Sequence, residues 1–276
     1  MLERVSAPEK PPGLDLKAIR RRIPQDGVLL RFAQLPDALV VWEVTATTFK
    51  WRSIPLSRAS IDVQVERFAE GCRTGRPDKT AGAMLSRLLL GDRVEKPPGW
   101  LVLVADESLR GLPWAALPIG ERYLVESTTL VHLPMLLPWR DVPQASADRR
   151  LIVADPGNDL VNARVEGDQI QKMLPGSELI TGKQVTGENL LKQIQGAGLI
   201  HYAGHAATDR DNPYLSYLEL NGGERLRLMD IHHLPLTSPL VFLNACGAGQ
   251  APREADGTLG LADGFLAAGA RAVVAS

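Results

Sequence analysis

Two short apolar runs, each ending in a reactive side chain, most constrain how this chain can fold. They are Leu199–His205, which reads LIHYAGH, and Leu240–Cys246, which reads LVFLNAC. Short continuous apolar runs are typical of strands that are buried on both faces of a parallel sheet. Such sheets place their functional groups at the carboxyl ends of the strands. We therefore predict that the His205 imidazole and the Cys246 thiol meet at one edge of a sheet.

The second half of the chain alternates short apolar segments with amphipathic ones. Strands are predicted at residues 151–154, 178–181, 199–203, 240–245 and 271–275, and helices at residues 162–174, 186–194 and 258–268. Strands that alternate with helices form a mainly parallel sheet with helices on both faces. The predicted fold class is therefore α/β.

The first half has a different pattern. Runs rich in β-branched and aromatic residues predict a β-meander with strands at residues 27–33, 38–45 and 48–55. Apolar stripes then predict helices at 61–72, with Ser60 as N-cap, and at 80–90. The first half thus forms a small region of β-meander plus helix.

The pattern changes again before the α/β part begins. Residues 100–105 predict a buried strand, and residues 123–125 and 129–133 are predicted to pair as small strands. We divide the chain into residues 1–78, with a polar N-terminal tail, the meander and a helix, and residues 79–276. The chain stops directly after a predicted strand, so we expect the second domain to be truncated at its C-terminus.

Composition and charge exclude several function classes. The 276 residues include 31 basic and 32 acidic side chains, and this balance gives no support for a nucleic-acid partner. No apolar run approaches 18 residues, so no membrane-spanning helix is predicted, and the N-terminus lacks the apolar core of a signal peptide. With only two cysteines, Cys72 and Cys246, a reducing cytoplasm is the expected setting.

His205 and Cys246 suit nucleophilic catalysis. A cysteine attacks a carbonyl group as a thiolate, and a neighbouring histidine takes the thiol proton and later protonates the leaving amine. The alternatives are that Cys246 is a small buried hydrophobe and that His205 is a hydrogen-bonded core histidine. Cys72 lies late in a polar helix beside Arg73, and we interpret it as structural or incidental.

Other motifs do not support cofactor chemistry. His201 and His205 are four residues apart, but no cysteine or carboxylate cluster accompanies them, so no metal is expected. The segment Gly176–Lys183 departs from a phosphate-binding loop in its spacing, and Gln184 replaces the required Ser or Thr. The chain has no Gly-x-Ser-x-Gly motif, which argues against a serine hydrolase. We expect no cofactor.

Several segments, in order, resemble the CHAT domain, a caspase-like cysteine peptidase domain often found behind tetratricopeptide repeats. These are LPWAAL at 112–117, the 199–205 run, the strand at 213–220, the 240–246 run and the segment 257–276. The resemblance implies a caspase-like α/β fold for residues 79–276. It implies that His205 is the catalytic histidine and Cys246 the nucleophile, with the backbone N–H groups of Cys246 and Ala206 as the oxyanion hole. Ala206 stands where the family usually has glycine.

The resemblance also implies a function. The chain is expected to be a cysteine endopeptidase that cleaves a partner protein under the control of an upstream repeat or sensor region. The alternatives are a non-catalytic caspase-like binding or scaffold module, or a cysteine acyltransferase or amidase. The loop that holds Asp209, Arg210 and Asp211 follows the histidine strand, so we interpret it as a substrate-subsite loop or as a solvated loop.

Overall fold

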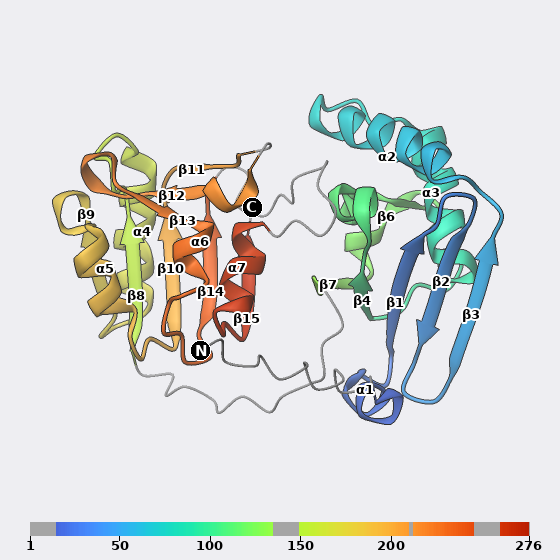
Figure 1. The fold of residues 1–276 in the computed structure, drawn as a ribbon, viewed down its shortest axis with the longest axis horizontal. Coiled ribbons are helices and arrows are strands. Elements are labelled where there is room, and N and C mark those ends of the chain that lie inside the picture. The colour runs from blue at the N-terminus through green and yellow to red at the C-terminus, as the bar shows by residue number, and fades with distance from the viewer. Residues whose placement is uncertain (1–14, 135–148, 210–211, 246–259, 276) are drawn as a thin grey trace, which may run out of the picture. The chain divides into compact units, whose positions relative to one another are not determined.

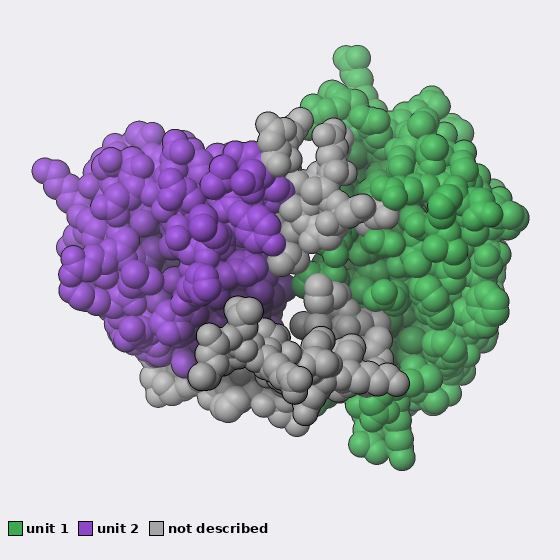
Figure 2. Space-filling model, in the orientation of Figure 1, with its two compact units in different colours: residues 1–140 green, residues 141–276 purple. Residues whose placement is uncertain are grey.

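The computed structural model describes residues 15–134, 149–209, 212–245 and 260–275 (Figure 1). The chain forms two compact units, residues 1–140 and residues 141–276, which we call unit 1 and unit 2 (Figure 2). The predicted domain boundary at residue 79 falls inside unit 1, and a domain start there stays a prediction. Among the described residues, every helix is too short or too polar to cross a lipid bilayer.

Unit 1 contains a mixed five-stranded sheet in the order β3-β2-β1-β4-β7. Its strands are β1 (Gly27–Gln34), β2 (Leu39–Val44), β3 (Phe49–Ile54), β4 (Trp100–Val104) and β7 (Thr129–His132). The first three pair antiparallel, which confirms the predicted β-meander, whereas β4 and β7 run parallel to β1.

The predicted pairing of residues 123–125 with 129–133 is wrong. β7 pairs with β4, and β6 (Arg122–Tyr123) instead pairs with β5 (Pro118–Ile119). The Glu126 carboxylate accepts a hydrogen bond from the Tyr123 N–H at 2.7 Å, and this contact closes a 3₁₀ turn over residues 124–126. The turn ends the strand before it can reach residues 129–133.

The described residues of unit 1 include three α-helices. They are α1 (Leu16–Arg22), α2 (Arg58–Arg73) and α3 (Lys79–Leu90). The N-cap of α2 is Ser57 rather than the predicted Ser60, because the Ser57 side chain accepts a hydrogen bond from the Ser60 N–H at 3.3 Å. The α2 and α3 helices pack on one face of the sheet and form its main apolar core.

The LPWAAL segment is part of this core. The Trp114 ring is fully buried, and its centroid lies 5.3 Å from the centroid of the Phe32 ring. Its indole N–H donates to the Leu109 carbonyl at 2.9 Å. The LPWAAL motif, one of the segments that resemble the CHAT domain, therefore packs in the core of unit 1.

Unit 2 contains an all-parallel five-stranded sheet in the order β15-β14-β10-β8-β9 (Figure 1). Its strands are β8 (Arg150–Ala154), β9 (Glu178–Thr181), β10 (Leu199–Ala203), β14 (Leu240–Asn244) and β15 (Ala272–Ala275). Its helices are α4 (Val161–Met173), α5 (Gly187–Ile194), α6 (Leu228–Ile231) and α7 (Leu261–Ala267). The predicted α/β fold, with a parallel sheet flanked by helices, is confirmed.

Alternating residues of the strands divide the sheet of unit 2 into two faces. Residues such as Ile200, Tyr202 and Leu243 pack with α5, α6 and α7 in one large apolar cluster. The other face lies against α4, where a Cβ at Gly167 would approach the Ala154 Cβ to 2.6 Å. Glycine at this position lets α4 lie close to the sheet.

A small antiparallel sheet follows the histidine strand. It consists of β11 (Ala206–Ala207), β12 (Tyr217–Glu219) and β13 (Arg225–Arg227) in that order. Short 3₁₀ segments complete the described secondary structure, at Gly91–Val94, Glu107–Gly111, Trp114–Ala116, Leu124–Glu126, Gly182–Gln184, Pro213–Leu215 and Asn221–Gly223.

Candidate active site

The backbone before His205 is held between two strands. The Gly204 N–H donates to the Asn244 carbonyl at 3.2 Å, which continues the parallel pairing of β10 with β14 past Ala203. A Cβ on Gly204 would lie 2.6 Å from the Tyr202 hydroxyl oxygen. Glycine is needed here because the Tyr202 side chain folds back against this point of the chain.

The Tyr202 hydroxyl fixes the backbone of His205 itself. Its oxygen lies 2.8 Å from the His205 carbonyl and 2.7 Å from the Glu219 carbonyl, so the O–H donates to this pair of acceptors. Burial, with a smaller contribution from the charge of Glu219, raises the pKa of Tyr202 far above its usual range. The hydroxyl therefore stays protonated and remains a donor at working pH.

The His205 imidazole points to solvent and has a carboxylate partner. Its side chain is 46% exposed, and its Nε2 lies 3.1 Å from Asp159 Oδ2. A carboxylate at Nε2 favours the tautomer with the proton on that nitrogen, which leaves Nδ1 as the base. This arrangement can orient the ring and stabilise an imidazolium.

Asp155 shapes the loop that carries Asp159. It is buried at the end of β8, has a φ of 48°, and accepts a hydrogen bond from the Leu160 N–H at 2.8 Å. Its other carboxylate oxygen pairs with Arg164 at 2.6 Å. These contacts close a tight turn between β8 and α4, and the turn presents Asp159 to His205.

Glu166 of α4 links the two strands that precede the predicted catalytic residues. Its carboxylate accepts hydrogen bonds from His201 Nε2 at 2.8 Å and from Asn244 Nδ2 at 2.7 Å. His201 is buried on β10 and Asn244 ends β14. His201 therefore has a structural partner of its own, and it does not share one with His205. Among the described residues, no three His, Cys, Asp or Glu side chains gather as a metal site would require.

A pocket of about 410 Å³ lies beside these groups. Its walls include Asp159 and Glu166, the first turn of α4, and the strand ends at Gly204 and Asn244. The pocket therefore reaches the residue directly before His205 and the residue two positions before Cys246.

Ala206 has the extended backbone of β11, which is an edge strand. The Glu219 N–H donates to the His205 carbonyl at 3.0 Å, so these two residues form a hydrogen-bonded pair. The next pair, Ala206 with Leu218, is then of the non-hydrogen-bonded kind, and the Ala206 N–H points away from β12. Alanine accommodates this conformation as well as glycine would.

Three predicted site residues, Cys246, Arg210 and Asp211, lie outside the described residues. The register pairs Ala203 with Asn244, and each is followed two positions later in the sequence by a predicted catalytic residue. The roles of Cys246 and of the 209–211 loop stay predictions.

Asp209 is described, and it lies beside another hollow. It accepts a hydrogen bond from the Asn212 N–H at 2.8 Å and lines a hollow of about 240 Å³ together with Arg225 and Arg227 of β13. The structure does not place Asp209 in the wall of the pocket next to His205.

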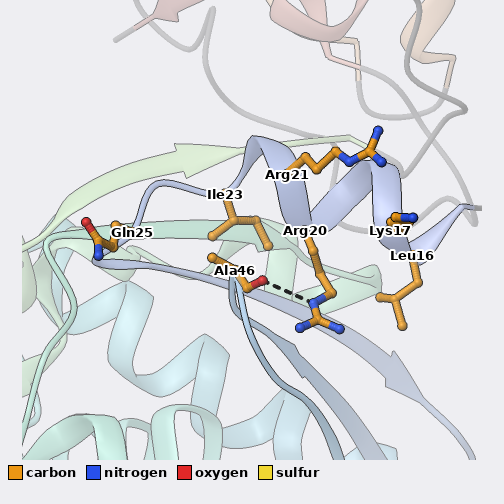
Figure 3. Close-up of a pocket in the computed structure, with 7 residues that line it drawn as sticks. All are labelled: Leu16, Lys17, Arg20, Arg21, Ile23, Gln25 and Ala46. Atoms are coloured by element: carbon orange, nitrogen blue, oxygen red, sulfur yellow. Dashed lines mark hydrogen bonds between the residues drawn. The ribbon is translucent and has the colours of Figure 1, made fainter.

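Unit 1 contains a free cysteine and a surface hollow that could also serve as sites. Cys72 packs against the core of unit 1, and burial raises the pKa of its thiol, which disfavours the thiolate. A hollow of about 760 Å³ beside α1 is lined by Lys17, Arg20 and Arg21, among others (Figure 3). Its described lining residues include no cysteine, serine, threonine or histidine, and Arg20 donates to the Ala46 carbonyl at 3.2 Å. Neither feature is as good a candidate for an active site as the edge of the unit 2 sheet.

The sequence analysis missed Asp159 and Glu166. Asp159 lies in a polar turn after a predicted buried strand, and this position at the end of a parallel strand was a usable signal. Glu166 is one of several polar residues of an amphipathic helix, and no local signal separates it from the others.

Comparison with solved structures gives the class of fold. The chain matches a crystal structure of the Saccharomyces cerevisiae separase–securin complex with a TM-score of 0.57 at 11% identity, covering 94% of this chain and 27% of the matched chain. Another crystal structure of that complex gives a TM-score of 0.55. The Arg-specific cysteine proteinase gingipain R gives 0.45 at 11% identity, covering 75% of this chain and 54% of that chain. The likeness to the separase complex shows a caspase-like α/β fold.

Comparison with protein-family models gives the family. Residues 79–276, well over half of the chain, match the CHAT domain. The chain therefore belongs to the CHAT domain family. The comparison with curated proteins found no match.

Proposed function

We propose that this chain is a cysteine endopeptidase in which His205 and Cys246 form a catalytic dyad that cleaves a partner protein. The observation that carries the proposal is the exposed His205 imidazole, paired with Asp159 beside a pocket where β10 and β14 end. Membership of the CHAT domain family and the caspase-like fold support it.

The reaction follows the chemistry of an activated thiol. His205 Nδ1 takes the proton of the Cys246 thiol, and the thiolate attacks the carbonyl carbon of the scissile peptide bond. Asp159 stabilises the imidazolium through Nε2. His205 then gives the proton to the leaving amine as the C–N bond breaks, and water hydrolyses the thioester that remains on Cys246.

The tetrahedral intermediate needs N–H donors aimed at its oxyanion. We assign this role to the backbone N–H groups of Ala206 and Cys246. The register of β11 supports the choice of Ala206, because its N–H is not used in pairing with β12.

We also propose, from the family resemblance, that an upstream repeat or sensor region controls the activity. The presence of only two cysteines in 276 residues fits a reducing compartment such as the cytoplasm.

The test is thiol labelling at neutral pH with a peptide-like electrophile, with the labelled residue located by mass spectrometry. Cys72 provides an internal control in the same chain, because its thiol has a raised pKa. We expect the label on Cys246 at a rate that depends on His205, and no such label in the Cys246→Ala variant.

The peptidase proposal would be overturned if Cys246 were labelled no faster than Cys72, or if the His205→Ala substitution left its labelling rate unchanged. The chain would then be better described as a non-catalytic caspase-like binding module. Among reactive outcomes, profiling with peptide and ester substrates separates an endopeptidase from an acyltransferase or amidase.

A further inference from the structure

We propose that the pocket beside His205 binds the side chain of the substrate residue that precedes the scissile bond, and that it selects a long cationic side chain, arginine or lysine. This inference rests on the proposed peptidase function, whose nucleophile would lie at the same edge of the sheet. It adds the class of substrate, which neither the fold nor the family membership gives.

The position of the pocket identifies which substrate residue would enter it. Gly204 and Asn244 form part of its wall, and they stand directly before His205 and two residues before Cys246 in the sequence. A peptide with its carbonyl carbon at the dyad therefore has the adjoining side chain within reach of this pocket.

The charge of the walls favours a cation. Two described lining residues, Asp159 and Glu166, are acidic, and no described lining residue is basic. Asp159 uses Oδ2 for His205, and among the described residues Oδ1 has no hydrogen-bond partner. Each Glu166 oxygen accepts one hydrogen bond and keeps a second lone pair.

The amino end of α4 opposes this charge only in part. Val161 begins the helix and Leu160, Val161 and Asn162 line the pocket. A helix N-terminus carries roughly half a positive charge, which is smaller than the charge of two carboxylates. An acidic substrate side chain would meet both carboxylates at close range and is disfavoured.

The remaining walls suit a long side chain. Leu160, Val161 and Ala163 add apolar surface to the same pocket, which holds about 410 Å³. The methylene stem of arginine or lysine packs on such surface while the charged end reaches an acceptor. A small or purely apolar side chain would leave the spare acceptor positions of Asp159 and Glu166 unused.

The first experiment compares peptidyl acyloxymethyl ketones that differ only in the residue next to the electrophile: arginine, lysine, leucine or aspartate. We expect second-order labelling of Cys246 to be fastest with arginine or lysine and at least about tenfold slower with aspartate. Equal rates, or a faster reaction with leucine or aspartate, would overturn the pocket assignment.

Two variants at Asn162 vary the charge of the pocket without touching the dyad or the Glu166 contacts. Asn162 is exposed in the first turn of α4. We expect Asn162→Asp to raise the arginine-over-leucine rate ratio by about threefold and Asn162→Lys to lower it by about threefold. Glu188→Gln, which removes an exposed carboxylate on α5 paired with Lys192, is the matched control and should leave the ratio unchanged. An arginine-over-leucine rate ratio that neither Asn162 substitution changes would overturn the proposal.

A binding measurement separates failure of the pocket from failure of the peptidase. The Cys246→Ala protein is titrated with N-acetyl-arginine methylamide and with N-acetyl-leucine methylamide, and chemical-shift changes are followed. Saturable binding of the arginine compound, weakened by Glu166→Gln, supports the pocket whether or not Cys246 reacts. His205-dependent labelling by iodoacetamide without any arginine preference would leave the proposed function standing and remove this inference.

Discussion

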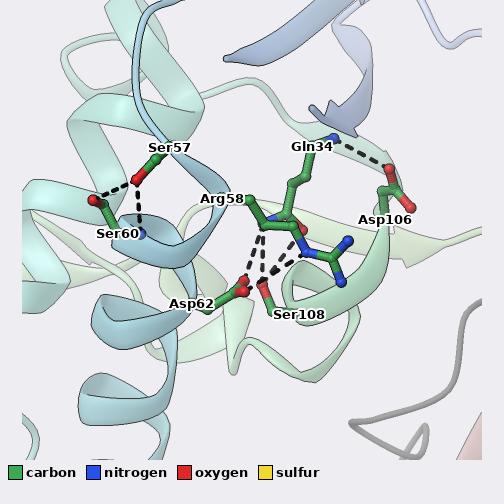
Figure 4. Close-up of polar contacts among 7 residues, drawn as sticks. All are labelled: Gln34, Ser57, Arg58, Ser60, Asp62, Asp106 and Ser108. Atoms are coloured by element: carbon green, nitrogen blue, oxygen red, sulfur yellow. Dashed lines mark hydrogen bonds and ion pairs between the residues drawn. The ribbon is translucent and has the colours of Figure 1, made fainter. Parts of the chain in front are cut away.

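Both units gather polar side chains where parallel strands end, and the two clusters differ in how they use their hydrogen bonds. In unit 1, Gln34 ends β1 and is only 6% exposed. Its N–H donates to Asp106 just beyond β4, and its side-chain amide donates to Asp62 and Ser108 (Figure 4). The donors of this buried amide are matched within the fold.

In unit 2, His205 lies just beyond β10 and its side chain is 46% exposed. Asp159 contacts one nitrogen of its ring, and a pocket lies beside this pair. A buried polar group with matched partners stabilises a fold, whereas an exposed one with spare capacity is available for a ligand. Similar positions at the ends of strands therefore hold a fully partnered, buried polar group in unit 1 and an exposed one beside a pocket in unit 2.

The largest expected effect separates two histidines of unit 2, His201 and His205. We expect His205→Ala to lower the rate of Cys246 labelling by about 10²- to 10⁴-fold, because the base is lost, with little change in thermal stability. His201→Ala should instead lower the melting temperature, because Glu166 then loses a donor near the core. Labelling kinetics and thermal melts of both variants test this contrast. Equal effects on rate would contradict it.

The next effect tests whether the LPWAAL motif at residues 112–117 of unit 1 acts through packing. Trp114→Ala should lower the free energy of unfolding by about 3–5 kcal/mol, because a fully buried ring is removed. Urea unfolding measures the change. A well-folded Trp114→Ala protein that has lost only its reactivity would show that the motif serves chemistry.

A smaller loss of stability is expected at the buried Gln34 cluster of unit 1. Gln34→Ala should cost about 1–3 kcal/mol of unfolding free energy, because Asp62 and Ser108 lose a buried partner. Urea unfolding gives the cost, and the labelling rate of the folded variant should match that of the unmodified chain. A changed rate would mean that this cluster is coupled to the active site.

The His205–Asp159 pair of unit 2 should show the opposite pattern, with a change in labelling rate and little change in stability. Asp159→Asn should slow Cys246 labelling by about tenfold, since a neutral amide holds the ring but stabilises an imidazolium less, and should leave the melting temperature nearly unchanged. Stopped-flow labelling with parallel thermal melts checks both parts. A large fall in stability without a change in rate would assign Asp159 to the fold.

The smallest expected effect concerns Cys72. Because burial raises the pKa of its thiol, the thiolate fraction at neutral pH is lower than for an exposed cysteine, and labelling should speed up as the pH rises. Following the labelling of Cys72 in the Cys246→Ala variant from pH 7 to 10 tests this. Fast labelling at pH 7 would remove its value as an internal control.

Local patterns predicted most elements of both units. The three meander strands match the predicted ranges to within two residues at each end, because alternation of side chains along a strand is a property of the sequence. Thr186 caps α5 by accepting from the Asn189 N–H at 3.2 Å, as its position before the apolar stripe predicts. Gly269 follows α7 with a φ of 108°, as expected for a glycine after a helix.

Partner choice was harder to predict. Ser57 and Ser60 are both acceptable N-caps, and the hydrogen bond from the Ser60 N–H to the Ser57 side chain shows that the first helical turn begins after Ser57. The short segments at 118–132 carry too few residues for a pattern, so the hydrogen bond from Tyr123 to Glu126 decided their pairing.

The sequence by itself determined the order of strands and helices, the candidate residues His205 and Cys246, and the family, because these depend on residue type and spacing along the chain. Only the tertiary structure decided which carboxylate contacts His205 and which carboxylates line the pocket beside it. Asp159 is 46 residues away from His205 in the chain, and Glu166 is 78 residues from Asn244. Such contacts arise when parallel strands bring their carboxyl ends together, and no local pattern records which of many polar side chains will then face the pocket.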